Sequence, residues 1–117
     1  MTIYLCSTTV IPAGAYGTWQ VQPLALEDAK IIAQELDFVS AVGHESTAEV
    51  MTSLLEVGVY MNRLTIQPKH GDYFICFKLN SRPPEGAILD RQTLEAVGYS
   101  FVIMLYHETG SCRLIPA

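Results

Sequence analysis

Residues 43–47 read GHEST, a run of residue types that could bind a phosphate group and protonate its leaving oxygen. Apolar residues at helical spacing follow over 50–55, so a helix should begin near Glu45. The first N–H groups of a helix lack intrahelical partners, and the helix dipole is positive at that end. Gly43 would let an anion approach closely, because it carries no side chain. His44 would then stand beside that anion as a candidate general acid.

Ser46 and Thr47 have two interpretations. Their hydroxyls could donate hydrogen bonds to a phosphate that is held at the helix N-terminus. Alternatively, one of them only caps the helix, and His44 is an ordinary surface residue. The pentapeptide alone leaves both an anion site and a simple helix cap open.

A second polar group lies in the loop NSRPPEGAI, residues 80–88, which Pro83 and Pro84 stiffen. Arg82 carries a planar fork of donors that suits a phosphate. Glu85 stands three residues further on, and a carboxylate near a phosphate is useful if it orients a nucleophile or a histidine. The alternative interpretation is a charged surface turn.

Asn62 and Arg63 form a third polar pair, at the start of the extended stretch NRLTIQP, residues 62–68. They could contact the same ligand as the GHEST run. The alternative is that they are the solvated end of a strand.

The overall composition favours one packed domain over residues 1–117. Half of the residues are hydrophobic and 16% are charged, which excludes a disordered chain. Seven Lys and Arg stand against twelve Asp and Glu, for a net charge of -5. A protein that coats DNA or RNA normally carries a basic face, so no DNA partner is expected. Any anionic ligand must be held by a few well-placed groups.

The cysteines and histidines do not predict a metal site or a disulfide framework. Three cysteines lie far apart in the sequence, at Cys6, Cys76 and Cys112. Cys6 and Cys76 lie in strand-like runs and are expected to be small buried hydrophobic residues. The three histidines lack metal-ligand spacing, and there is no Walker, dinucleotide-binding or nucleophile-elbow motif. The opening residues do not resemble a signal peptide, and no apolar run reaches membrane-spanning length, so a cytosolic protein without cofactors is expected.

The periodicity of the chain predicts an α/β fold with a mixed β-sheet and helices packed against it. Asp90 is a plausible N-cap and Gly98 a plausible C-cap of the last helix. A Gly-containing turn at 69–72 should join two strands into a β-hairpin. The expected strands are 2–8, 18–24, 62–68, 73–79 and 99–108, and the expected helices are 25–37, 45–56 and 90–98.

Three motifs in order resemble those of the viral anti-CRISPR ring nucleases. These are VGHEST before an apolar helix, NR at the opening of the expected hairpin, and SRPPEGAIL before a short helix. That family was first known from viruses that infect Sulfolobus, and it has relatives in bacteria and their phages. Its corresponding motifs read Gly-His-Asp-Ser-Thr, Asn-Arg and Gln-Arg-Leu-Glu-Glu-Gly, and the similarity covers nearly the whole chain.

The resemblance implies a homodimer that binds cyclic tetra-adenylate, the second messenger of type III CRISPR defence. It also implies cleavage without a metal to linear di-adenylates that end in a 2′,3′-cyclic phosphate. By the same resemblance, His44 is the general acid, Glu85 matches the glutamate of the family, and Arg82 lies near the scissile phosphate. The pair Asn62 and Arg63 matches the Asn-Arg pair.

The sequence departs from the family pattern in two places. The first strand of the family ends in Asn-Ala-Phe-Ser, whereas this chain has Ser7 followed by two threonines and a valine. The Gln before the loop arginine is replaced by Ser81. Two other interpretations remain open: a module that sequesters the messenger without cutting it, and a structural or interaction dimer without a nucleotide ligand.

Overall fold

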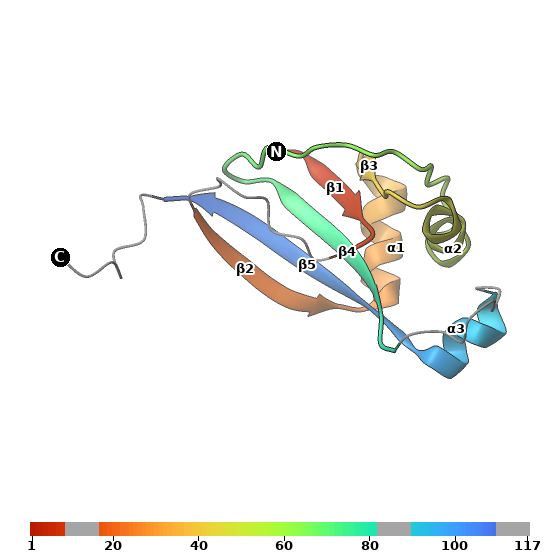
Figure 1. Cartoon of the computed structure of the whole chain (residues 1–117). Coiled ribbons are helices and arrows are strands. Elements are labelled where there is room, and N and C mark those ends of the chain that lie inside the picture. The colour runs from red at the N-terminus through yellow and green to blue at the C-terminus, as the bar shows by residue number, and fades with distance from the viewer. Residues whose placement is uncertain (9–16, 82–89, 110–117) are drawn as a thin grey trace.

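The fold is a five-stranded mixed sheet with helices packed against it, as the sequence predicts (Figure 1). The computed structural model describes residues 1–8, 17–81 and 90–109. None of the helices in these ranges is long and apolar enough to cross a membrane. In chain order the elements are β1 (Ile3–Cys6), β2 (Gly17–Leu24), α1 (Leu26–Glu35), β3 (Val39–Ala41), α2 (Glu45–Leu55), β4 (Tyr73–Leu79), α3 (Arg91–Val97) and β5 (Tyr99–Glu108).

The strands lie in the order β2-β5-β4-β1-β3. β1 pairs in parallel with both β3 and β4, while β5 pairs antiparallel with β4 and β2. The carboxyl ends of β1 and β3 meet at one edge, where Cys6 pairs with Ala41. Ligands of open α/β sheets bind outside the carboxyl ends of parallel strands. In Figure 1 the ends of β1 and β4 point toward the side of the molecule where α2 and α3 lie.

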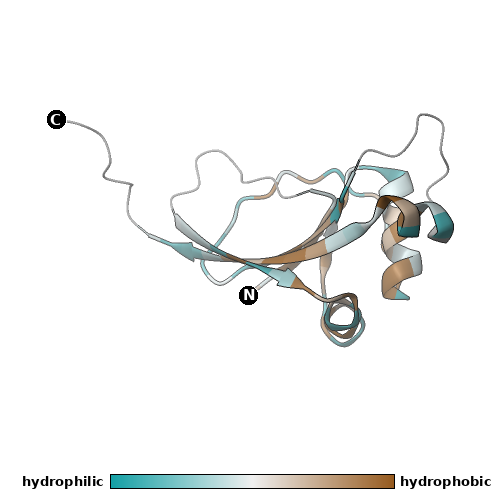
Figure 2. Cartoon of the chain, turned by 90° about the horizontal axis from the view of Figure 1, so that it is seen from below, coloured by the Kyte–Doolittle hydropathy of each residue, from teal (hydrophilic) through white to brown (hydrophobic). Residues whose placement is uncertain are grey.

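The two faces of the sheet carry different hydrophobic clusters. One face packs against α1 and α2, with Leu5, Ile75 and Phe101 among the buried strand residues. The opposite face carries a smaller cluster built from Phe74, Cys76, Met104 and Tyr106, against which Tyr4, Trp19 and Ile66 pack. In Figure 2 the hydrophobic colour runs along the middle of the sheet, whereas hydrophilic residues gather at strand ends.

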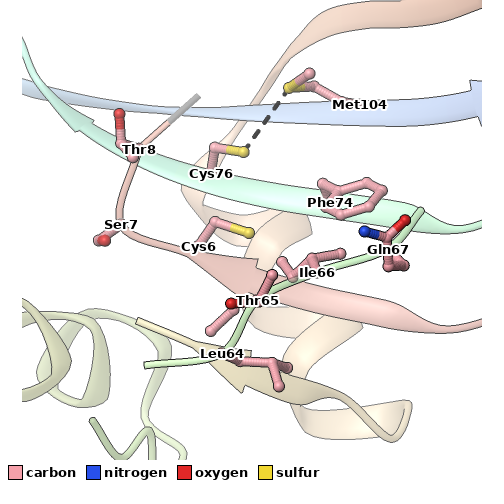
Figure 3. Close-up of a pocket in the computed structure, with 11 residues that line it drawn as sticks. Cys6, Ser7, Thr8, Leu64, Thr65, Ile66, Gln67, Phe74, Cys76 and Met104 are labelled. Carbon is pink, nitrogen blue, oxygen red and sulfur yellow. Dashed lines mark hydrogen bonds between the residues drawn. The ribbon is translucent and has the colours of Figure 1, made fainter. Parts of the chain in front are cut away.

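The predicted β-hairpin between 62–68 and 73–79 is wrong. Residues 62–68 are not a strand, and β4 has no free edge to offer them, because β1 occupies one edge and β5 the other. Instead Ile66 packs on the smaller cluster beside Phe74 (Figure 3). The alternation of residue types over 62–68 belongs to a segment that is not a strand and that packs through Ile66 on one face of the sheet.

β3 is not among the strands predicted from the sequence. This strand has three residues, and it pairs only with β1 among the named strands. The helices agree with prediction to within a few residues, and the ends of α3 are as expected. Asp90 Oδ1 accepts a hydrogen bond from Thr93 N at 2.8 Å, which lowers the pKa of Asp90. Gly98 ends the helix with a φ of 81°.

Candidate functional site

The N-terminus of α2 lies directly after the carboxyl end of β3. His44 is the N-cap residue, with extended backbone angles (φ -131°, ψ 133°), and α2 begins at Glu45 as predicted. No side chain caps the helix, so its first N–H groups have no side-chain partner within the described chain. His44 is exposed, and its imidazole is not used as a cap.

The alternative in which Ser46 or Thr47 caps α2 is wrong. Both residues lie inside the first turn of the helix, where Ser46 is exposed and Thr47 half-buried. Their side chains are therefore available near the helix N-terminus, but they do not terminate it. The arrangement is that of an uncapped helix end with one imidazole and two hydroxyls close to it in sequence.

Asn62 and Arg63 lie against the β3–α2 connection. The backbone N–H of Asn62 donates to Val42 O at 2.8 Å, and its side-chain amide donates to Ser40 O at 2.7 Å. Arg63 Nε donates to Gly43 O at 3.1 Å. Two of the three motifs, separated in sequence by some twenty residues, are thus in direct contact. Asn62 has a structural role, whereas the exposed Arg63 brings a positive charge beside Gly43.

The surroundings of residue 43 within the described chain do not explain why it is a glycine. A Cβ built at this position would meet only Arg63 Cγ, at 3.9 Å, which is an ordinary van der Waals contact. Its φ also lies outside the left-handed range that favours glycine. The glycine is therefore not required by the packing or the backbone of these residues.

Ser7 and Ser81 lie at the ends of two neighbouring strands. Ser7 follows β1, is half-buried, and lines a pocket together with Ala41 from β3. Ser81 follows β4, and its hydroxyl donates to Val97 O at 3.3 Å, so it is engaged with α3. Arg82 and Glu85 lie outside the residues that the structure describes.

Ser40 supports the site and was not identified from the sequence. It is fully buried, and its hydroxyl donates to Tyr60 O at 2.6 Å. Together with the bond from Asn62 to Ser40 O, this contact fixes the 60–63 segment to β3. The sequence indicates this role only weakly, by placing a serine within the apolar run FVSAV.

The described ranges hold no group of three or more His, Cys, Asp or Glu side chains that could hold a metal ion. Around the N-terminus of α2 lie hydrogen-bond donors, the guanidinium of Arg63 and the imidazole of His44, together with the carboxylate of Glu45 in the first turn. This set can bind an anion and transfer a proton.

Comparisons with known proteins place most of the chain in one group. Residues 3–101 match the family model described as STIV B116-like. The uncharacterized protein ORF117 of Acidianus two-tailed virus is 35% identical over 103 residues, which is 85% of this chain and 88% of that protein. The uncharacterized protein 26 of Sulfolobus islandicus filamentous virus is 32% identical over 101 residues, which is 84% of this chain and 86% of that protein.

A bacterial protein and a solved structure are also similar. The uncharacterized protein YddF of Bacillus subtilis (strain 168) is 30% identical over 90 residues, covering 75% of this chain and 83% of YddF. The structure of B116 of Sulfolobus turreted icosahedral virus covers 90% of this chain and 99% of its own, with a TM-score of 0.71. At 19% sequence identity, the similarity to the B116 structure shows a shared fold and nothing more.

Proposed function

The chain belongs to the STIV B116-like family, and on that premise we propose that it is a metal-independent ring nuclease. It would bind cyclic tetra-adenylate and cleave it to linear di-adenylates with 2′,3′-cyclic phosphates. Its role would be to switch off type III CRISPR signalling in the cytosol. One observation carries the proposal: the uncapped N-terminus of α2 holds the exposed His44 and contacts the Asn62–Arg63 pair through Gly43.

A ribose 2′-OH lies next to its own phosphate, so the nucleophile is already positioned by the substrate. The protein must then set an in-line geometry, neutralise developing negative charge and protonate the leaving 5′ oxygen. The free N–H groups of α2 and the guanidinium of Arg63 supply positive potential. His44 supplies the proton.

Ser46 and Thr47 add hydroxyl donors beside the phosphate, and Ser7 would contact the ring from the end of β1. Arg82 and Glu85 enter by the family resemblance, from the loop after Ser81. In this proposal Arg82 stabilises the scissile phosphate. A homodimer would place one His44 from each subunit at opposite bonds of the ring, because an isologous dimer shares the two-fold symmetry of a four-nucleotide ring.

The test is incubation with cyclic tetra-adenylate in EDTA, followed by chromatography of the products. We expect cleavage by the wild type and at least a ~100-fold slower rate for His44→Ala, as for loss of a general acid. His70→Ala is the matched control, because it removes another exposed imidazole, one whose Nδ1 accepts from Glu108 N. Its rate should equal that of the wild type.

Two other outcomes assign a different function. Tight binding without cleavage would identify a protein that sequesters the messenger. No binding at all would leave a structural or interaction role and would refute the assigned ligand. Equal rates for wild type and His44→Ala would refute the role of the histidine.

A further inference from the structure

Three sulfur atoms lie in a row across three adjacent strands. Cys6 on β1 and Cys76 on β4 are direct partners in the parallel register. Cys76 Sγ in turn lies 3.8 Å from Sδ of Met104 on β5, to which its thiol donates. Figure 3 shows the three side chains on the same face of the sheet, with Cys76 between the other two.

The same sulfur atoms border a pocket of about 340 Å³. Cys76 and Met104 are buried, whereas Cys6 is half-buried. Exposed residues at the rim, including Thr8 and Gln67, leave a way in from solvent. A small cation can therefore reach the sulfur atoms without unfolding the sheet.

Cys6 and Cys76 lie side by side on β1 and β4, and both line the same pocket. A soft cation bound by both sulfur atoms would displace the proton of each thiol, so that two protons are released on binding.

We propose that Cys6, Cys76 and Met104 form a binding site for Cu(I). Two thiolates and one thioether are the soft ligands that Cu(I) prefers. Zinc favours four ligands in a tetrahedron, and these come from Cys, His, Asp or Glu side chains. The described residues that line the pocket include no His, Asp or Glu, and their polar side chains are hydroxyls and one amide. The donor set therefore selects a monovalent soft ion.

This site needs neither His44 nor a nucleotide, although Ser7, proposed above to contact the ring, also lines the pocket. It occupies the sheet face opposite α1 and α2, within the smaller hydrophobic cluster. A bound ion would cross-link β1, β4 and β5 through side chains, in addition to the backbone ladder. Binding should consequently stabilise the folded chain by mass action.

The experiment is an anaerobic titration of the metal-free, reduced protein with Cu(I), in competition with a chromophoric Cu(I) chelator. We expect one Cu(I) per chain and a thiolate-to-metal charge-transfer absorption in the ultraviolet. The melting temperature should rise when Cu(I) is buffered above its dissociation constant. Zn(II) in the same assay should bind more weakly.

Variants identify the ligands. Loss of an outer-shell partner alone lowers metal affinity by about 10–100-fold, so Cys6→Ser and Cys76→Ser should each cost at least ~100-fold. Met104→Leu keeps the side-chain volume and should cost about 10-fold. Cys112→Ser is the matched control, because it removes a thiol that the proposal does not use, and it should bind as the wild type does.

Circular dichroism and metal-free melting of each variant check that it folds, and Cys6→Ser is the mildest change because Cys6 is only half-buried. The proposal is overturned if the reduced wild type takes up no Cu(I). It is equally overturned if folded Cys6→Ser retains full affinity, if Cys112→Ser loses it, or if Zn(II) binds as tightly as Cu(I).

Discussion

At the scale of single residues, Gly43 links the structure to the proposed ligand. Nothing in its described surroundings demands a glycine, since a Cβ would meet only Arg63 Cγ at an ordinary distance. A residue that the fold does not require is explained if a ligand approaches the backbone at that point. Adding one methyl group at residue 43 should therefore affect ligand binding without affecting folding.

For Gly43→Ala we expect little change in stability, within about 0.5 kcal/mol, because the substitution causes no clash and no unfavourable φ. The affinity for cyclic tetra-adenylate should fall by at least about 10-fold, as a phosphate is pushed away from the N-terminus of α2. Calorimetric titration and chemical denaturation measure the two quantities. Gly58→Ala is the matched control, because a Cβ there would meet no atom within 4 Å and Gly58 is not part of the proposed site. Unchanged affinity in Gly43→Ala would argue against close approach at this glycine.

At the scale of elements, the site depends on a short extended segment held between α2 and β3. Thr52 Oγ1 accepts from Val59 N at 2.9 Å and lies 2.8 Å from Ala48 O, to which it donates. Val59 begins the stretch that reaches Asn62, whose N–H donates to Val42 O. A hydroxyl in the last turn of α2 thereby helps to fix the position of the Asn-Arg pair.

Thr52→Val preserves the side-chain shape but removes the acceptor for Val59 N, and this should lower stability by about 1–3 kcal/mol. The loss should be accompanied by faster hydrogen exchange at the amide of Asn62, because its segment is less well anchored. Denaturant unfolding and exchange monitored by NMR give the two readouts. Ser53→Ala, an exposed change on the same helix, should alter neither. If Asn62 exchanges no faster in Thr52→Val, the coupling between α2 and this segment is absent.

The sheet was predictable from the sequence in most of its parts. The strands around 18–24, 73–79 and 99–108 and all three helices followed from periodicity and capping residues. The position of β3 did not, since three residues give too short a pattern and its stability comes from pairing with β1. The hairpin failed because strand pairing is decided by which edges are free, and local alternation carries no information on that.

The structure brings two of the predicted motifs into contact, while the part that their residues play in binding or catalysis stays a prediction. The expected neighbours His44, Asn62 and Arg63 are brought together, at the predicted start of α2. The sequence did not reveal that Asn62 would hold a backbone carbonyl, or that Ser40 would anchor it. Such roles depend on tertiary contacts between segments about twenty residues apart. The positions of Arg82 and Glu85 remain predictions.

At the scale of the whole molecule, the acidic net charge and the few donors of the proposed site favour a small anionic ligand. A net charge of -5 does not favour a long polyanion, whereas a small cyclic oligonucleotide needs only a few donors. The ring has two-fold symmetry, and a closed homodimer has the same symmetry. Two copies of the chain would therefore be the functional unit.

We expect light scattering coupled to size exclusion to give twice the chain mass of 12.9 kDa, and one cyclic tetra-adenylate to bind per two chains. Both numbers follow from a site shared by the two subunits. The ligand stoichiometry is measured by titration at protein concentrations well above the dissociation constant. A monomer that cleaves the ring at full rate would contradict the shared site.

The position of β1 between β3 and β4 affects how the sheet assembles during synthesis of the chain. Leu5 pairs with Ser40 on one side and with Ile75 on the other, so β1 has both of its edges paired only after β4 has been synthesised, about seventy residues later. Long-range parallel pairing of this kind folds slowly and leaves strand edges open meanwhile. A nascent chain arrested before β4 emerges would expose β1 as a template for aggregation. Assembly of the sheet is therefore postponed until β4 and β5 have been synthesised.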